Sequence, residues 1–391
     1  MLIPISNSAR DYAWGSETLI AELQGREPSG TPEAEIWFGD HPGSPSRVDD
    51  GTGRPLDRAL AEVGVPPLPY LLKLLAAGMS LSIQAHPSRD QAAEGFAREE
   101  RAGVPRDAVE RLYKDENHKP EIIVALSERF RALVGLRPLA ATRRLLASLP
   151  ERPGVRALVA ALEPVDGEDD AAVLHRVMGW VLSGEATEVV DDLAAALAAS
   201  GPDVDHEASE FAAERDVLRR IADQFPADAG LVVATLMNLV ELARGEALFA
   251  PAGVLHAYQD GLGVELMAAS DNVLRGGLTP KHIDVPELMR VVDTSTGAAP
   301  IVEPDEIAPG VFSYDAGVPD FQLVRVEATF EAVAEIPLTG TAIVLATSGD
   351  VVIEAGDDRV ELVPGTAAVV IGASVAIGGA GEAFVAQPGR P

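Results

Sequence analysis

The chain of 391 residues contains no cysteine. This absence excludes a disulfide scaffold, a zinc site made of thiolates and a cysteine nucleophile. Long apolar runs are also missing, since no segment approaches the roughly 18 residues that a membrane-spanning helix needs. The first residues carry neither the basic segment nor the apolar core of a secretory signal. We therefore expect a cytoplasmic protein without a membrane partner.

Positive charge is scarce as well, with 31 basic against 61 acidic residues and a net charge of −30. Nucleic acid and anionic membranes are poor partners for such a chain, because binding to phosphate backbones needs a basic footprint. A small anionic ligand stays compatible, since a local group of cations dominates its own cleft within a Debye length of about 8 Å. We expect a small-molecule ligand, and a monomer or weak homodimer.

Lysine is the rarer of the two strong cations, and it occurs at only four positions: Lys73, Lys114, Lys119 and Lys281. A lysine ammonium is a compact point charge, whereas the arginine guanidinium is planar and permanently charged. The four positions therefore either reflect a composition biased towards arginine or mark places where arginine cannot substitute.

The spacing of apolar residues and of turn-forming Pro and Gly residues changes three times along the chain. Residues 1 to about 90 contain short apolar runs between Pro and Gly residues, which is typical of strands. A helix is expected after Ser88 as its N-cap, a second helical piece from Asp107, and a strand over 121–126. From about residue 137 to 225, apolar residues recur at a spacing of three to four, which predicts a helical block.

The C-terminal half returns to strands. The last segment of the helical block is expected over 207–225, and one more helix over 229–243. Strands then resume after Gly245, and the last 80 or so residues carry glycine turns at short intervals, as in a small sandwich or jelly roll. The sequence predicts a mainly β protein with an inserted α domain. Its first β domain is split over 1–136 and 226–300, with helices over 137–225 and a second β domain over 301–391.

Two segments offer metal-ligand chemistry. In SIQAHP (82–87), alternate strand residues share a face, so Gln84 and His86 point together with Ser82 behind them. An imidazole suits zinc and an amide oxygen suits a hard cation. In NHKPE (117–121), Glu121 opens a strand and Lys119 lies two residues away. A surface histidine and an ordinary solvated turn are the alternatives.

Two later segments add to these candidates. In the segment GVLHAYQDG (253–261), His256 follows a Pro/Gly turn, as a ligand near the mouth of a β-barrel would. The segment 265–282 is dense in polar residues, and its Arg275 and Lys281 could neutralise an anion. Its paired glycines allow a backbone to approach a ligand closely; the alternative is an exposed loop between domains.

Together these segments resemble the motifs of the type I mannose-6-phosphate isomerase family, the phosphomannose isomerases. The resemblance rests on SIQAHP, YKDENHKPE, GVLHAYQDG and ELMAASDNVLRGGLTPKH, with DYAWGS (11–16) and AEIWFGDHPGSPS (34–46) before them. The motifs occur in the family's order from residue 11 to residue 282. The family is built of cupin jelly-roll β-barrels with an inserted helical domain, which agrees with the texture of the chain.

The resemblance implies one Zn²⁺ per chain, held by Gln84, His86, Glu121 and His256. It also implies that Arg275 is the active-site arginine of the family. All of these ligands are nitrogen or oxygen donors, consistent with a chain that lacks cysteine.

The resemblance places further residues at the pocket. Lys119 and Glu265 occupy motif positions there and are expected to be catalytic, while Ser82, Lys281 and Asp271 are expected to contact substrate. Three of these side chains, Lys119, Glu265 and Asp271, remain alternatives for the group that moves the proton.

The implied activity is the reversible isomerisation of mannose 6-phosphate and fructose 6-phosphate through a cis-enediol, which supplies mannose metabolism and GDP-mannose synthesis. A metal ion would polarise the sugar oxygens. The main alternative is a cupin that binds a sugar phosphate without catalysis. A cupin performing Fe(II)–oxygen chemistry is less consistent, because that chemistry prefers a three-ligand facial site.

Overall fold

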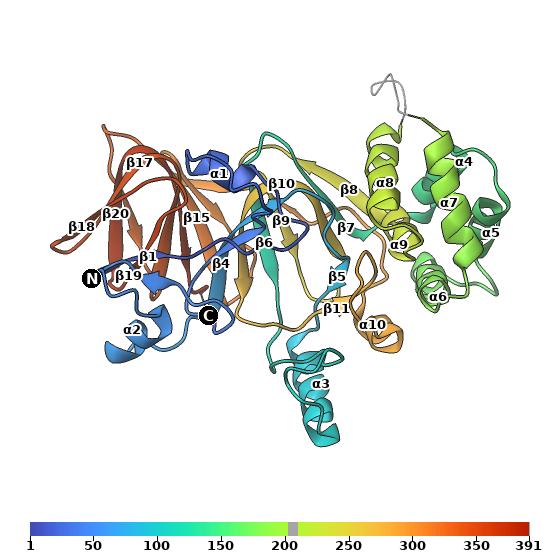
Figure 1. The fold of residues 1–391 in the computed structure, drawn as a ribbon, viewed down its shortest axis with the longest axis horizontal. Coiled ribbons are helices and arrows are strands. Elements are labelled where there is room, and N and C mark those ends of the chain that lie inside the picture. The colour runs from blue at the N-terminus through green and yellow to red at the C-terminus, as the bar shows by residue number, and fades with distance from the viewer. Residues whose placement is uncertain (202–209, 391) are drawn as a thin grey trace.

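The computed structural model describes residues 1–201 and 210–390. Figure 1 shows two β-rich parts side by side, one of them C-terminal, with a group of helices at the opposite end of the molecule. Within the described residues, two antiparallel sheets of ten strands each form the mainly β framework. None of the helices in these residues is long and apolar enough to cross a membrane.

The first sheet comes mostly from the first half of the chain and from residues after the helices. Its strands are β2 (Glu35–Phe38), β4 (Tyr70–Ala77), β5 (Gln84–Ala85), β6 (Glu121–Ala125), β7 (Phe130–Leu136), β8 (Met237–Leu242), β9 (Ala247–Ala250), β10 (His256–Ala268), β11 (Leu274–Arg275) and β12 (Ile301–Val302). Strand β10 organises this sheet, because one half of it pairs with β5 and β7 and the other half with β4 and β6.

The second sheet holds the C-terminal strands. It consists of β1 (Leu2–Ser6), β3 (Arg47–Val48), β13 (Asp305–Ala308), β14 (Val311–Tyr314), β15 (Gln322–Ala328), β16 (Ala334–Pro337), β17 (Ala342–Ala355), β18 (Asp358–Leu362), β19 (Ala367–Val370) and β20 (Ser374–Gln387). The sequence assigned residues 1–136 to the first β domain, but β1 pairs with β19 and β3 pairs with β1. Among the described strands, β19 otherwise pairs only with β17, so its other edge would be unpaired without β1. Pairing with β1 supplies hydrogen-bond partners for the backbone groups of that edge.

The two sheets share one apolar core, so they are packed against each other. Ile5 of β1, Leu74 of β4, and Leu345 and Phe384 of the C-terminal strands belong to the same buried cluster. The Tyr70 hydroxyl crosses this boundary and donates to carbonyl oxygens of the C-terminal part at 3.0 Å.

The helices fall into two groups. Outside the helical block lie α1 (Leu19–Leu23), α2 (Leu56–Glu62), α3 (Arg89–Ala102) and α10 (Val285–Val291). The block itself contains α4 (Leu139–Ala147), α5 (Pro153–Ala161), α6 (Asp170–Leu182), α7 (Thr187–Ala199), α8 (Ala212–Gln224) and α9 (Gly230–Leu236). Their apolar faces share a core with Leu133 of β7 and with Ile83 and Leu255, which directly precede β5 and β10.

Two of the expected helices, one after Ser88 and one over 207–225, are found in the structure. Ser88 is the N-cap of α3, as predicted, and the structure adds a reciprocal capping box with Gln91. The predicted helix over 207–225 is observed as α8, while 207–209 lie outside the described residues.

Two predicted helices were wrong in extent. The helical piece from Asp107 is a series of turns, in which the buried Arg111 side chain donates to the carbonyl oxygens of Tyr113 and Val104. The helix expected over 229–243 ends at Leu236, and the chain continues as β8. Pairing of β8 with β7 outweighs the local helical pattern there.

Candidate active site

A cavity of about 610 Å³ opens at the first sheet. Its wall includes residues from β2, β4, β5, β6, β10 and β11, together with the loops that follow them. Of the ten side chains singled out in the sequence, all except His86 line this cavity, and His86 lies directly behind it against Glu121. They are Ser82, Gln84, Lys119, Glu121, His256, Glu265, Asp271, Arg275 and Lys281.

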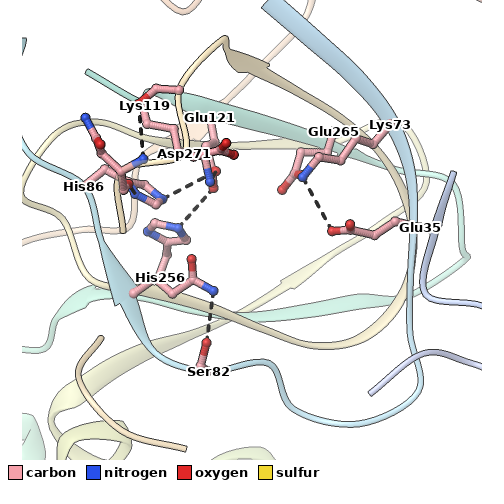
Figure 2. A network of polar contacts seen from close by, with 12 residues as sticks. Glu35, Lys73, Ser82, His86, Lys119, Glu121, His256, Glu265 and Asp271 are labelled. Atoms are coloured by element: carbon pink, nitrogen blue, oxygen red, sulfur yellow. Dashed lines mark hydrogen bonds and ion pairs between the residues drawn. The ribbon is translucent and has the colours of Figure 1, made fainter. Parts of the chain in front are cut away.

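Three buried side chains form the centre of the site. The ligand atoms of His86, Glu121 and His256 all lie within 4.8 Å of one another. His86 Nε2 is 3.4 Å from one oxygen of Glu121, and His256 Nε2 is 3.1 Å from the other. Figure 2 shows both imidazoles directed at this carboxylate.

The protons on the two imidazoles decide what this centre can hold. His86 Nδ1 lies 2.7 Å from the Asn272 carbonyl oxygen, and His256 Nδ1 lies 3.0 Å from the Val254 carbonyl oxygen. A carbonyl only accepts, so each Nδ1 carries a proton, and in the neutral form of the ring each Nε2 then presents a lone pair. The two lone pairs face carboxylate oxygens, an arrangement that is repulsive unless a cation lies between them.

Further observations fit a metal ion at this centre. Within the described part of the chain, His86 Nε2 is a buried nitrogen without a hydrogen-bond partner. Burial and the charge of Lys119 lower the pKa of His86 to about 4, so its imidazole is neutral at pH 7. Burial alone would raise the pKa of Glu121, but the ammonium of Lys119 at 2.8 Å outweighs it and keeps the carboxylate ionised. Neutral imidazoles and a carboxylate are the donor set that zinc accepts.

Strand register brings the proposed fourth ligand to the same place. Gln84 of β5 lies opposite His256 of β10 on one side and opposite Arg275 of β11 on the other. The Gln84 amide nitrogen donates to the Ser82 hydroxyl at 3.0 Å, and its amide oxygen accepts no hydrogen bond within residues 1–201 and 210–390. Ser82 therefore orients Gln84 as well as lining the cavity.

A second group of charges lies across the site from the histidines (Figure 2). Lys73 Nζ is 2.8 Å from Glu265 and 3.5 Å from Glu35, and all three side chains are buried. Burial opposes the charge on Lys73, but the two facing carboxylates outweigh it and raise the pKa of this lysine. Glu265, expected from the sequence to be catalytic, is therefore held in a buried ion pair.

Cationic side chains mark another part of the cavity wall. Burial lowers the pKa of Arg275, although a guanidinium stays charged at any physiological pH. Burial and the charge of Arg275 also lower the pKa of Lys281. Both cations line the same cavity.

The paired glycines next to Arg275 do not have the expected role. Gly277 approaches the backbone of Gly230 at the start of α9, since a Cβ on Gly277 would lie 2.3 Å from Gly230 Cα. Gly276 faces apolar side chains, including Ile83. The close approach that these glycines permit is to the start of α9 and to the core.

The loop that carries Asp271 is tied to the segment before Lys119. Asp115 accepts from the Asp271 backbone N–H at 2.9 Å, and the Asn272 side chain contacts Asp115 and Asn117. The carboxylate of Asp271 lies at the cavity wall and contacts His41. The same loop supplies the carbonyl that orients His86.

Sequence reasoning missed several residues of the site. Glu35, Trp37 and Tyr12 line the cavity, and Trp37 donates to Glu35 at 2.7 Å. They lie in the two N-terminal motif segments, so the motif match was the signal that could have identified them. Lys73 was noticed only as a rare lysine, because its two carboxylate partners lie far away in the sequence.

Comparison with known proteins gives a consistent picture. Residues 2–139 match the family model described as phosphomannose isomerase type I, catalytic domain. The chain is 35% identical to the mannose-6-phosphate isomerase of Escherichia coli (strain K12), with 93% of each chain covered. It is 30% identical to that of Cryptococcus neoformans, with 92% of each covered.

Solved structures agree over almost the whole length. A variant of phosphomannose isomerase from Salmonella typhimurium superposes with a TM-score of 0.86 at 31% identity, covering 99% of both chains. A zinc-bound mannose 6-phosphate isomerase gives a TM-score of 0.84 at 31% identity, again with 99% of both chains covered.

Proposed function

Because the chain belongs to the type I phosphomannose isomerase family, it is an isomerase of mannose 6-phosphate and fructose 6-phosphate, and we propose that the reaction takes place in the cavity around Glu121. The observation that carries this proposal is the pair of imidazole Nε2 lone pairs facing one buried carboxylate. We assign the zinc site to His86, Glu121 and His256, with the amide oxygen of Gln84 as the fourth ligand.

The isomerisation reduces C1 and oxidises C2 within the substrate, and two protons move with this change. One proton leaves C2 of the open-chain aldose to form an enediol and is returned at C1, while a second proton passes from the hydroxyl on C2 to the oxygen on C1, which gives the ketose. Zn²⁺, when bound, supplies electrophilic stabilisation for the negative charge that develops on the sugar oxygens. The side chains of the chain itself must bind the phosphate, orient the sugar and move the proton.

Lys119 is the best-placed group for the proton transfer. Its Nζ lies 2.8 Å from Glu121, at the centre of the site. Glu265 is committed to Lys73, whereas Asp271 lies at the cavity wall beside His41. In its neutral form, Lys119 would take the proton from C2 and return it to C1. Asp271 then accepts a hydrogen bond from a sugar hydroxyl.

The two cations take the remaining roles. Arg275 is one β-bridge away from Gln84, so we assign it to the negative charge that develops near the metal ligands. Lys281, further along the same loop, binds the phosphate together with the positive field of Arg275. Ser82 holds Gln84 and completes the substrate wall.

The architecture is assigned in the same way. We propose that residues 1–136 and 226–300 form the catalytic β domain, except that strands β1 and β3 pair into the C-terminal sheet. Residues 137–225 form the inserted helical domain and 301–391 the second β domain, both β domains being cupin jelly rolls. The antiparallel sheets with their long bent strands β10, β17 and β20 support this assignment. We further propose a cytoplasmic monomer or weak homodimer whose reaction supplies mannose metabolism and GDP-mannose synthesis.

The test is a coupled assay for fructose 6-phosphate on chelated protein, before and after zinc is returned. Chelation should abolish turnover and zinc should restore it, and His256→Ala should lower both bound zinc and activity. His175→Ala is the matched control, since His175 lies exposed on α6 beside the Met289 carbonyl. Full activity in protein shown to be metal-free by elemental analysis would contradict the metal assignment.

Two further measurements distinguish proton transfer from hydride transfer, and an enzyme from a protein that only binds the sugar phosphate. With substrate deuterated at C2, loss of label to ordinary water indicates proton transfer through an enediol, whereas complete retention over many turnovers indicates hydride transfer. Binding of mannose 6-phosphate by zinc-loaded protein without any turnover would instead reveal a sugar-phosphate-binding protein.

A further inference from the structure

His41 lies in a tight turn just after β2, next to the cavity wall. Its side chain is only 11% exposed. The imidazole packs edge-to-face against Trp37, with ring centroids 5.1 Å apart. A histidine enclosed in this way has little freedom to rotate, so the direction of its two nitrogens is a fixed property of the fold.

The turn also fixes which ring nitrogen carries the proton. The backbone N–H of Gly43 donates to His41 Nδ1 at 3.1 Å, so Nδ1 is an acceptor and the proton of the neutral ring is on Nε2. A Cβ on Gly43 would lie 3.2 Å from Nδ1 and 3.4 Å from the Trp37 ring, so glycine gives this N–H the room it needs.

The donor end of the ring faces a carboxylate across the site. His41 Nε2 lies 3.3 Å from Asp271 Oδ2. The Asp271 backbone is independently held, because its N–H donates to Asp115 at 2.9 Å. The hydrogen bond from His41 is the main cause that lowers the pKa of Asp271, with smaller contributions from the charges of Lys119 and Lys73 and with burial opposing them.

We propose that His41 is a positioning residue for substrate binding: its Nε2–H holds one oxygen of Asp271, so that the other oxygen is presented to a sugar hydroxyl in the cavity. The inference rests on the proposed role of Asp271 as a hydroxyl acceptor. His41 itself does not touch the reacting atoms in this scheme. Without it, the half-exposed carboxylate could rotate away from the cavity.

The experiment is a double-mutant cycle on zinc-loaded full-length protein, with KM and kcat for mannose 6-phosphate as readouts. His41→Leu should raise KM about tenfold with little change in kcat, since losing one hydrogen bond to a charged group has about that effect. His41→Gln, which keeps an amide donor at nearly the same position, should recover most of the affinity. Asp271→Ala should raise KM at least as much as His41→Leu.

The double variant His41→Leu/Asp271→Ala tests whether His41 acts through Asp271. If His41 acts through Asp271, then His41→Leu should cause no further loss in the Asp271→Ala protein. Equal losses in both backgrounds would show that His41 supports something else, such as Trp37, and would overturn the proposal. Wild-type KM in His41→Leu would overturn it as well.

Controls separate this proposal from the one on which it rests. His175→Leu, in the helical block, should leave KM unchanged, and zinc content and thermal unfolding should be measured for every variant. If His41→Leu loses zinc or unfolds, His41→Phe, which keeps an aromatic ring against Trp37 but has no donor, gives the same comparison in both Asp271 backgrounds. An inactive zinc-loaded wild type would contradict the proposed function, whereas an active wild type with additive losses would contradict only the role of His41.

Discussion

Replacing Gly277 by alanine tests how the helical block supports the active site. Gly277 has φ = +126° and follows Arg275 by two residues. A Cβ there would lie 2.3 Å from Gly230 Cα and 2.8 Å from Gly230 N. The Asp228 carboxylate ties the same loop to α9, because it accepts backbone N–H groups from both Gly230 and Leu278 at 2.7 and 3.0 Å.

The size of the effect follows from these distances. Carbon atoms in contact prefer about 3.5–4.0 Å, so the loop and α9 would have to separate by more than about 1 Å. Strain at a positive φ and overpacking together cost about 2–6 kcal/mol of folding free energy. A displacement of about 1 Å in a catalytic group can reduce the rate by about 10²-fold. Gly277→Ala should therefore lower both Tm and kcat, since the moved loop carries Arg275.

The measurements are thermal unfolding and steady-state isomerisation of the zinc-loaded protein. At about 2.1 cal/mol/K of unfolding entropy per residue, a chain of 391 residues loses about 1.2 °C per kcal/mol, so we expect Tm to fall by about 2–7 °C. Gly297→Ala is the matched control, because a Cβ on Gly297 meets no atom within 4 Å among the described residues and its φ is not positive. Wild-type Tm and kcat in Gly277→Ala would refute the reasoning.

Two other predictions concern the charged side chains of the cavity. Arg275→Ala should lower kcat by about 10²–10³-fold, the scale of one lost transition-state charge stabiliser. Arg275→Lys should recover only part of this, because the guanidinium fork is lost; wild-type kcat in Arg275→Ala would show a purely structural arginine. Lys73→Met should cost about 3–5 kcal/mol of stability, since it leaves Glu265 buried without its partner, whereas the double variant Lys73→Met/Glu265→Leu should regain most of that loss. Denaturant unfolding at pH 7 measures both, and a single variant as stable as wild type would argue against the ion pair.

Local patterns in the sequence determined much of this protein. The helical period marked the block from α4 to α8, and Ser88 as an N-cap marked the start of α3. Strand β6 was visible as a run of apolar residues opened by Glu121. The motif segments identified the family and the residues that meet at the cavity. They could do so because a metal site needs particular side chains in a fixed order along the chain, and such a pattern can be recognised in the sequence.

Tertiary structure decided whatever depends on partners that are distant in the chain. The pairing of β1 with β19, and the change from α9 to β8, follow from open strand edges that no local window contains. Lys73 and Glu265 are 192 residues apart, yet strand register sets them side by side. The contacts of Gly277 with Gly230 and of His41 with Asp271 are equally remote. Periodicity encodes which face of an element is buried, whereas only packing determines which buried charge meets which.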